Sequence, residues 1–146
     1  MDHVAILKRS FGFKDKILSG EKTVESRWYF QRRAPWNGIH AGDMVYFKNS
    51  GEAVTLCADV KKVMQFSDLS PVQVKKIVQR YGVGIGLDRS EQAQFIKDRA
   101  KKKYCILIFL KNPQRIKPFM IDKSGFGSMA AWISVPKINK IKIKNL

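Results

Sequence analysis

The chain has 146 residues, a length that fits one compact domain, and 45% of them are hydrophobic. A chain of this composition can build an apolar core, which excludes a wholly disordered protein. Its 28 Lys and Arg residues outnumber its 12 Asp and Glu residues, giving a formal net charge of +16. Residues 101–146 carry 11 basic side chains and one acidic side chain, so the charge is concentrated in the last third. This excess favours a polyanionic partner, with nucleic acid first and an anionic membrane surface second.

The sequence lacks the features that several classes of protein require. The longest apolar run, 104–110, is far shorter than the roughly 20 residues of a membrane-spanning helix. The first residues show no basic segment followed by an apolar one, so we expect no secretory signal and a cytoplasmic protein. Cys57 and Cys105 lie in apolar segments and are expected to be buried thiols without a disulfide partner. Because His3 and His40 have no zinc-ligand spacing with them, we predict no metal and no cofactor.

The pattern of hydrophobic residues predicts strands in the first half of the chain, interrupted by one helix. A strand at 4–7 precedes an amphipathic helix at 11–19, which Gly20 ends. Residues 23–28 alternate as a strand does, and a turn-rich loop at 30–42 follows. Further strands are predicted at 44–47 and 53–63.

The region from about 68 to 100 is predicted to be a helical insertion. The Ser-Pro-Val-Gln sequence at 70–73 combines a Ser cap, a Pro in the first turn and a Gln three residues after the Ser. We expect this helix to stop before a glycine-rich linker at 82–86, and a second helix to cover 88–101.

The last part of the chain returns to strands. We predict strands at 103–110 and 115–121, separated by a turn at 112–113, and a final edge strand at 137–144 with a basic outer side. About six strands and two or three helices, without regular alternation, disfavour a doubly wound parallel sheet. They favour an α+β, mainly β fold: a small antiparallel or mixed β-barrel with flanking helices, in a single domain of residues 1–146.

The side chains of Lys22, Glu25 and Arg27 cluster at the first helix-to-strand junction. Glu25 and Arg27 are two apart on a strand and therefore share a face. Arg27 offers a fork of donors for a phosphate or a base edge, and Glu25 can accept from an amine or hold a catalytic proton. Lys22 can bind an anion, or act as a nucleophile or base if burial lowers its pKa. A solvated strand face with a Glu–Arg pair explains the same spacing.

The segment 20–27 resembles the G-x-K-x-x-E-x-R signature of the ASCH family, which belongs to the PUA-like β-barrel superfamily. The Gly-Asp pair at 42–43, ahead of a strand, is also similar to that family. The resemblance covers residues 4–64 and extends plausibly to 103–110. It implies an RNA-binding cleft at one end of a β-barrel.

The resemblance also implies which residues line that cleft, namely Lys22, Glu25 and Arg27. Some ASCH proteins are ribonucleases, and others are amidohydrolases of acetylated cytidine with a Lys-Thr-Glu catalytic set. Lys22 matches that lysine, whereas Glu25 stands where the family has the threonine, and the third residue has no counterpart. Other relatives carry the domain within transcription coactivators, which implies a binding role.

Aromatic and basic side chains alternate directly after the motif. Aromatic rings stack on unpaired bases and arginines hold phosphates, so we predict RNA contacts by Trp28, Arg32, Arg33 and Trp36. The competing interpretation is that Trp28 and Phe30 face the core and only Trp36 is exposed. We adopt it for Phe30 and leave Trp28 open.

Two further segments contribute candidate RNA-binding residues. Lys8 and Arg9 end the first strand, and Ser124 and Ser128 flank a glycine-containing loop whose N–H groups suit a phosphate. A plain turn is an equally good interpretation of that loop.

The leading hypothesis is a protein that binds single-stranded RNA or a flipped-out base, with the basic surface supplying affinity and the motif supplying selectivity. The alternatives are a ribonuclease, an amidohydrolase of a modified nucleoside with Lys22, Glu25 and Arg27 as catalytic residues, and a protein-interaction module.

Overall fold

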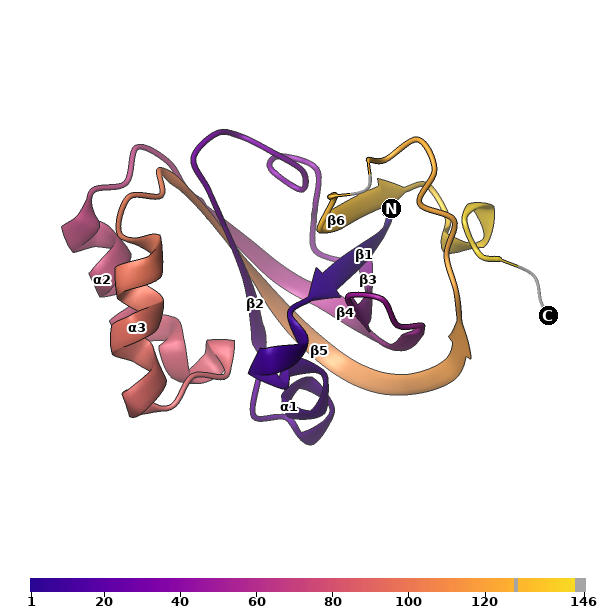
Figure 1. Cartoon of the computed structure of the whole chain (residues 1–146), viewed down its shortest axis with the longest axis horizontal. Helices are drawn as coiled ribbons and strands as arrows, with labels where there is room; N and C mark the ends of the chain where they lie inside the picture. Colours follow the sequence, from indigo (N-terminus) through magenta and orange to yellow (C-terminus); the bar gives the residue numbers. More distant parts are fainter. Residues whose placement is uncertain (128, 144–146) are drawn as a thin grey trace.

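The computed structural model describes residues 1–127 and 129–143. In this part of the chain one mixed sheet of six strands, in the order β2-β5-β4-β3-β1-β6, curves into a half-barrel (Figure 1). Its strands and helices, with their bounds, are β1 (Asp2–Leu7), β2 (Val24–Tyr29), β3 (Met44–Asn49), β4 (Val54–Phe66), β5 (Tyr104–Phe119), β6 (Trp132–Val135), α1 (Phe13–Ser19), α2 (Pro71–Ile85) and α3 (Arg89–Arg99), with short 3-10 turns η1 (Arg9–Phe11) and η2 (Ile138–Lys140). The predicted fold class, α+β and mainly β with a barrel-like sheet, is confirmed.

The sheet is antiparallel except for the pair β1–β3, which is parallel. Among the strands that the structure describes, β2 pairs only with β5 and β6 only with β1, so these two strands are the edges of the sheet. Curvature of the sheet brings these edges toward each other on the open side of the half-barrel, where the candidate site lies.

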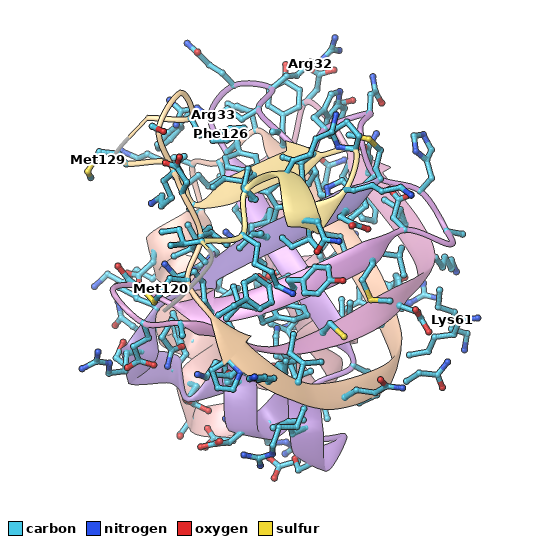
Figure 2. All side chains as sticks on the ribbon, turned by 90° about the vertical axis from the view of Figure 1, so that its right-hand side faces the viewer. Arg32, Arg33, Lys61, Met120, Phe126 and Met129 are labelled. Atoms are coloured by element: carbon cyan, nitrogen blue, oxygen red, sulfur yellow. The ribbon has the colours of Figure 1, made fainter. Side chains whose placement is uncertain are left out.

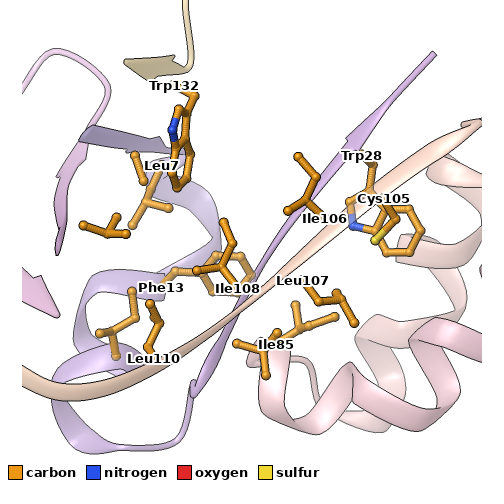
Figure 3. Packing of buried hydrophobic residues seen from close by; sticks show 14 of the residues in the cluster. Leu7, Phe13, Trp28, Ile85, Cys105, Ile106, Leu107, Ile108, Leu110 and Trp132 are labelled. Atoms are coloured by element: carbon orange, nitrogen blue, oxygen red, sulfur yellow. The ribbon is translucent and has the colours of Figure 1, made fainter. Parts of the chain in front are cut away.

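The core is built around the first half of β5. Cys105, Ile106, Leu107 and Ile108 are fully buried because both faces of the strand are covered. Figure 3 shows Leu107 directed toward α2 and Ile106 and Ile108 directed into the half-barrel. Such a continuous apolar run is typical of a strand buried on both faces.

The capping box predicted at Ser70 is present, and the structure has a second one at the start of α3. Ser70 and Gln73 cap α2 reciprocally, and Asp88 and Glu91 do the same for α3. The predicted end of the first of these helices is wrong, because α2 continues through the expected linker and ends at Gly86, whose φ is 99°.

The glycines inside α2 serve close packing instead of ending the helix. A Cβ on Gly82 would lie 2.9 Å from the side chain of Gln92 on α3, and one on Gly84 would lie 3.2 Å from Val24 on β2. A glycine that permits close approach carries the same sequence signal as one that breaks a helix.

The structure corrects two predictions for the last third of the chain and adds one strand. The strands expected at 103–110 and 115–121 form one strand, β5, which bends at Asn112 with φ 52° and shows register shifts against β4. The edge strand expected at 137–144 is instead the turn η2 followed by a single bridge between Lys142 and Ile121; residue 144 lies outside the described residues. The strand β6 was not predicted, because four residues are too few to show a period.

None of the helices that the structure describes is long and apolar enough to span a bilayer. Cys57 and Cys105 are buried free thiols.

Candidate nucleic-acid interface

Lys22 lies in the interior, where α1, β2 and the end of α2 meet. Its Nζ pairs with the Glu25 carboxylate at 3.1 Å and donates to the carbonyl oxygens of Val24 at 2.6 Å and Ile85 at 2.7 Å. The Nζ also lies 4.1 Å from the centre of the Phe13 ring. Two hydrogen bonds and one ion pair therefore surround this ammonium group, which carries three N–H donors. Burial lowers the pKa of Lys22, and the charge of Glu25 opposes that shift.

Glu25 is enclosed between two cations and is only 3% exposed. Its Oε1 faces Lys22, and its Oε2 accepts from Arg27 Nε at 3.0 Å and Nη2 at 2.6 Å. Burial alone would raise the pKa of Glu25, but the charges of Lys22 and Arg27 hold it below its ordinary value. The carboxylate is therefore ionised, and both of its oxygens are engaged.

Arg27 joins the two edges of the sheet. It stands on β2, and its guanidinium donates across the opening to Ala131 O at 3.1 Å and Ile6 O at 3.3 Å. Ile6 is on β1 and Ala131 directly precedes β6, so one side chain bridges the open side of the half-barrel. The Arg27 side chain is 11% exposed, and its Cζ lies 5.1 Å from the centre of the Trp132 ring.

A cleft of about 710 Å³ opens beside this ionic cluster. A volume of this order is typical of small-molecule and cofactor sites. The charged residues that line it are basic Lys8, Arg27, Arg99, Lys102 and Lys123 and acidic Glu25 and Asp98. Of the motif residues, Glu25 and Arg27 line the cleft, whereas Lys22 lies outside its lining.

Aromatic rings form an apolar part of the cleft next to Arg99. Phe95 packs edge-on against Trp28 and Phe11, with ring centres 6.1 and 6.3 Å apart. Trp28 is buried, and its Nε1 donates to Ser26 Oγ at 2.9 Å. The Arg99 Cζ lies 3.5 Å from the centre of the Phe95 ring, so a cation covers this apolar surface.

Lys102 borders the cleft just beyond α3, with its Nζ 4.0 Å from the centre of the Phe30 ring. The core placement expected for Phe30 is wrong: its side chain is 60% exposed because β2 ends one residue earlier. Burial lowers the pKa of Lys102, and the neighbouring cations Arg99 and Arg33 lower it further. Like charges are therefore crowded at this end of the cleft.

Other predicted RNA-binding residues lie outside the lining of the cleft. Arg9 is exposed and pairs with Glu52, with 2.7 Å between Nη2 and Oε2. Arg32 places its Cζ 5.7 Å from the Trp36 ring and 5.6 Å from the Tyr104 ring. Trp36 packs edge-on against Tyr104, with ring centres 5.2 Å apart, so this indole is partly covered.

Figure 2 shows Arg33 pointing outward at the upper end of the molecule, the end at which the loop carrying Phe126 also lies. In that loop the Ser124 hydroxyl donates to the Asp122 carboxylate and is engaged within its own turn. Ser128 lies outside the described residues.

Phe95, Asp98 and Arg99 were not singled out from the sequence. They come from the helical insertion, about 70 residues from the motif, and nothing in a single sequence indicates that this insertion packs beside β2. Lys102 belongs to the basic run Lys101–Lys103, for which the sequence favours non-specific phosphate contact. Within residues 1–127 and 129–143, no group of three or more His, Cys, Asp and Glu side chains is placed to hold a metal ion.

Several solved structures share this fold. A variant of the ASCH protein from Zymomonas mobilis aligns with a TM-score of 0.68 and 21% identity, covering 95% of this chain and 93% of that chain. The ASCH protein of that organism itself gives 0.65 and 20%, covering 93% and 88%. The N-terminal domain of Staphylothermus marinus McrB gives 0.52 and 11%, covering 80% and 75%. No family model and no curated protein matches the sequence. The chain therefore has the fold of an ASCH domain, as the resemblance of its sequence predicted.

Proposed function

We propose that this chain is an ASCH-type protein that binds RNA and takes one nucleotide of it into the cleft. The observation that carries the proposal is the charge of the cleft. Of its five basic side chains, Lys8, Arg99, Lys102 and Lys123 have no carboxylate within 4.0 Å among the described residues. Unpaired cations beside aromatic rings suit a phosphate-linked base.

In this proposal the motif residues shape the site more than they react. The Lys22 ammonium and both Glu25 oxygens are already engaged, and Arg27 is held by Glu25 and two carbonyl groups. A general base needs a free lone pair and a pKa near the working pH, and neither Lys22 nor Glu25 offers both. These contacts favour binding over the ribonuclease and amidohydrolase alternatives. The cytoplasmic location stays a prediction of the sequence.

A matched pair of double variants tests the proposal. Lys8→Glu with Lys123→Glu reverses two cleft charges, and Lys75→Glu with Lys76→Glu reverses two exposed charges on α2 outside the cleft lining. Both change the net charge equally. With a labelled single-stranded RNA of about ten nucleotides, we expect fluorescence polarisation to show an affinity loss of at least about tenfold for the cleft variant and only a few-fold loss for the other.

Equal losses in the two variants would mean that binding does not use the cleft. RNA binding that is absent in the unaltered protein would reject the proposal outright. If the labelled RNA is cut by the unaltered protein and not by the cleft variant, the ribonuclease alternative replaces simple binding.

A further inference from the structure

We infer that Arg99 and Lys102 form a phosphate subsite, so that the cleft selects a nucleotide and rejects the uncharged nucleoside. This inference rests on the proposed function and names the chemical class of its ligand. It concerns the end of α3 and the turn after it, outside the sequence motif.

Arg99 is held in place while most of its donors stay free. Its Cζ lies 3.5 Å from the centre of the Phe95 ring, and its one hydrogen bond among the described residues runs from Nη1 to Phe95 O at 3.5 Å. Because a guanidinium carries five N–H donors, most of them have no partner in the described part of the chain. Asp98 lines the same cleft, but its carboxylate accepts from Gln94 at 2.7 Å and forms no ion pair with Arg99.

Lys102 adds a second unpaired cation. Its Nζ lies over the Phe30 ring at 4.0 Å, and within the described residues it has neither a hydrogen bond nor an ion pair. Arg99 and Lys102 line the same cleft, and the pKa of Lys102 is lowered by burial first and then by the positive charges of Arg99 and Arg33. A bound phosphate relieves this repulsion, and an uncharged nucleoside does not.

A structural explanation for Arg99 also exists, since a cation near the end of a helix stabilises the partial negative charge of its last carbonyl groups. That role makes no difference between a nucleotide and a nucleoside. Discrimination between these two ligands is therefore the property to measure.

The test uses Arg99→Met and Lys102→Met, with Lys97→Met and Lys101→Met as controls, because each control removes one exposed lysine near the same end of α3 without lining the cleft. Labelled RNA is displaced from each protein by cytidine 5′-monophosphate or by cytidine. In the unaltered protein and both controls we expect the monophosphate to displace RNA at least about tenfold better.

In the two subsite variants we expect the preference for the monophosphate over cytidine to fall to a few-fold. We also expect the slope of the logarithm of RNA affinity against the logarithm of salt concentration to become shallower by about 0.7. If they match the lysine controls while Lys8→Glu with Lys123→Glu still loses RNA, the subsite inference fails and the proposed function stands. If the unaltered protein does not bind RNA, both fail. Should Arg99→Met not fold, Lys102→Met decides alone, because that side chain is only partly buried.

Discussion

A lysine inside a protein core needs acceptors for its ammonium group, and Lys22 has such acceptors on several sides. The ammonium is enclosed by Glu25, two carbonyl groups and the face of Phe13. Glu25 pairs with both cations of the cluster, so removing Glu25 leaves Lys22 buried without a counter-ion, and removing Lys22 leaves buried oxygens without a donor. At this scale the motif is a structural unit on which the cleft is built.

Replacing Lys22 tests this interpretation. We expect Lys22→Met to lower the free energy of unfolding by about 3–5 kcal/mol, because the buried carbonyl oxygens of Val24 and Ile85 lose their donor and Glu25 loses one of its two cations. Urea denaturation measures the loss, and Lys61→Met, at an exposed position, serves as the control with a change below about 0.5 kcal/mol. Equal stability of the two variants would show that the cluster does not hold the fold together.

His3 is a further buried titratable residue, and no pattern in the sequence assigned it a role. Its Nε2 lies 2.9 Å from Asp43, and its Nδ1 lies 2.9 Å from Ser134 Oγ and accepts from Trp132 Nε1 at 3.2 Å. An indole N–H only donates, so Nδ1 carries a lone pair and the ring is neutral. Burial lowers the pKa of His3 from 6.5, although Asp43 opposes the shift.

A lowered pKa makes stability depend on pH with a definite sign. Below pH 6.5 the unfolded chain protonates its histidine while folded His3 resists, so the unfolded state binds more protons. We expect the melting temperature to be constant above that pH and to fall as the pH drops toward 5. His3→Gln should flatten this dependence, and His40→Gln, at an exposed position, should retain it. A melting temperature that is independent of pH in the unaltered protein contradicts the assignment.

At the scale of elements, the motif region also completes the end of α2. The last carbonyl groups of this helix receive donors from outside it: Gly84 O from the Thr23 N–H at 2.8 Å, Ile85 O from Lys22 Nζ at 2.7 Å and Gly86 O from Lys16 Nζ at 2.7 Å. Cations at a helix C-terminus stabilise its partial negative charge. The helical insertion is thus fastened to the motif by its own backbone.

Gly86 is the position where a side chain would crowd this junction. Its φ is 99°, and a Cβ would lie 3.3 Å from both Lys22 Cβ and Phe13 Cε1. Gly51 has a φ of 78° with open space around it, so Gly51→Ala measures the backbone strain alone, about 1–2 kcal/mol. We expect thermal unfolding to show a larger loss for Gly86→Ala; equal losses would mean that the junction adapts.

The sequence predicted elements well where local chemistry defines them. The capping sequence at Ser70 and the alternation before Trp28 depend on neighbours in the chain, and the structure has both the helix and the strand. It failed where tertiary contacts decide: Gly82 ends no helix because Gln92 packs against it, and Pro113 breaks no strand because β5 passes it in a bend. The lining of the cleft by Arg99 depends on how the insertion docks, which no local pattern records.

At the scale of the whole molecule, the net charge of +16 predicts how binding responds to salt. The logarithm of the RNA association constant falls linearly with the logarithm of the salt concentration, and each phosphate contact on a single strand contributes about −0.7 to that slope. The four unpaired cleft cations therefore give a slope of about −3. Titrating labelled RNA at increasing potassium chloride measures it. A slope near zero would contradict polyelectrolyte binding and favour the protein-interaction alternative.

The bridge made by Arg27 has a consequence for the solubility of the protein. Within residues 1–127 and 129–143, β2 and β6 each have one unpaired side, and an unpaired strand readily adds a strand from another molecule. Arg27 reaches from β2 to Ile6 O on β1 and to Ala131 O, which already accepts from the Ile6 N–H, so its side chain spans the gap between the two edges, where an added strand would have to lie. Arg27→Ala should therefore increase concentration-dependent self-association, which light scattering measures. A variant that does not self-associate more than the unaltered protein would show that the unpaired edges of β2 and β6 are protected by other means.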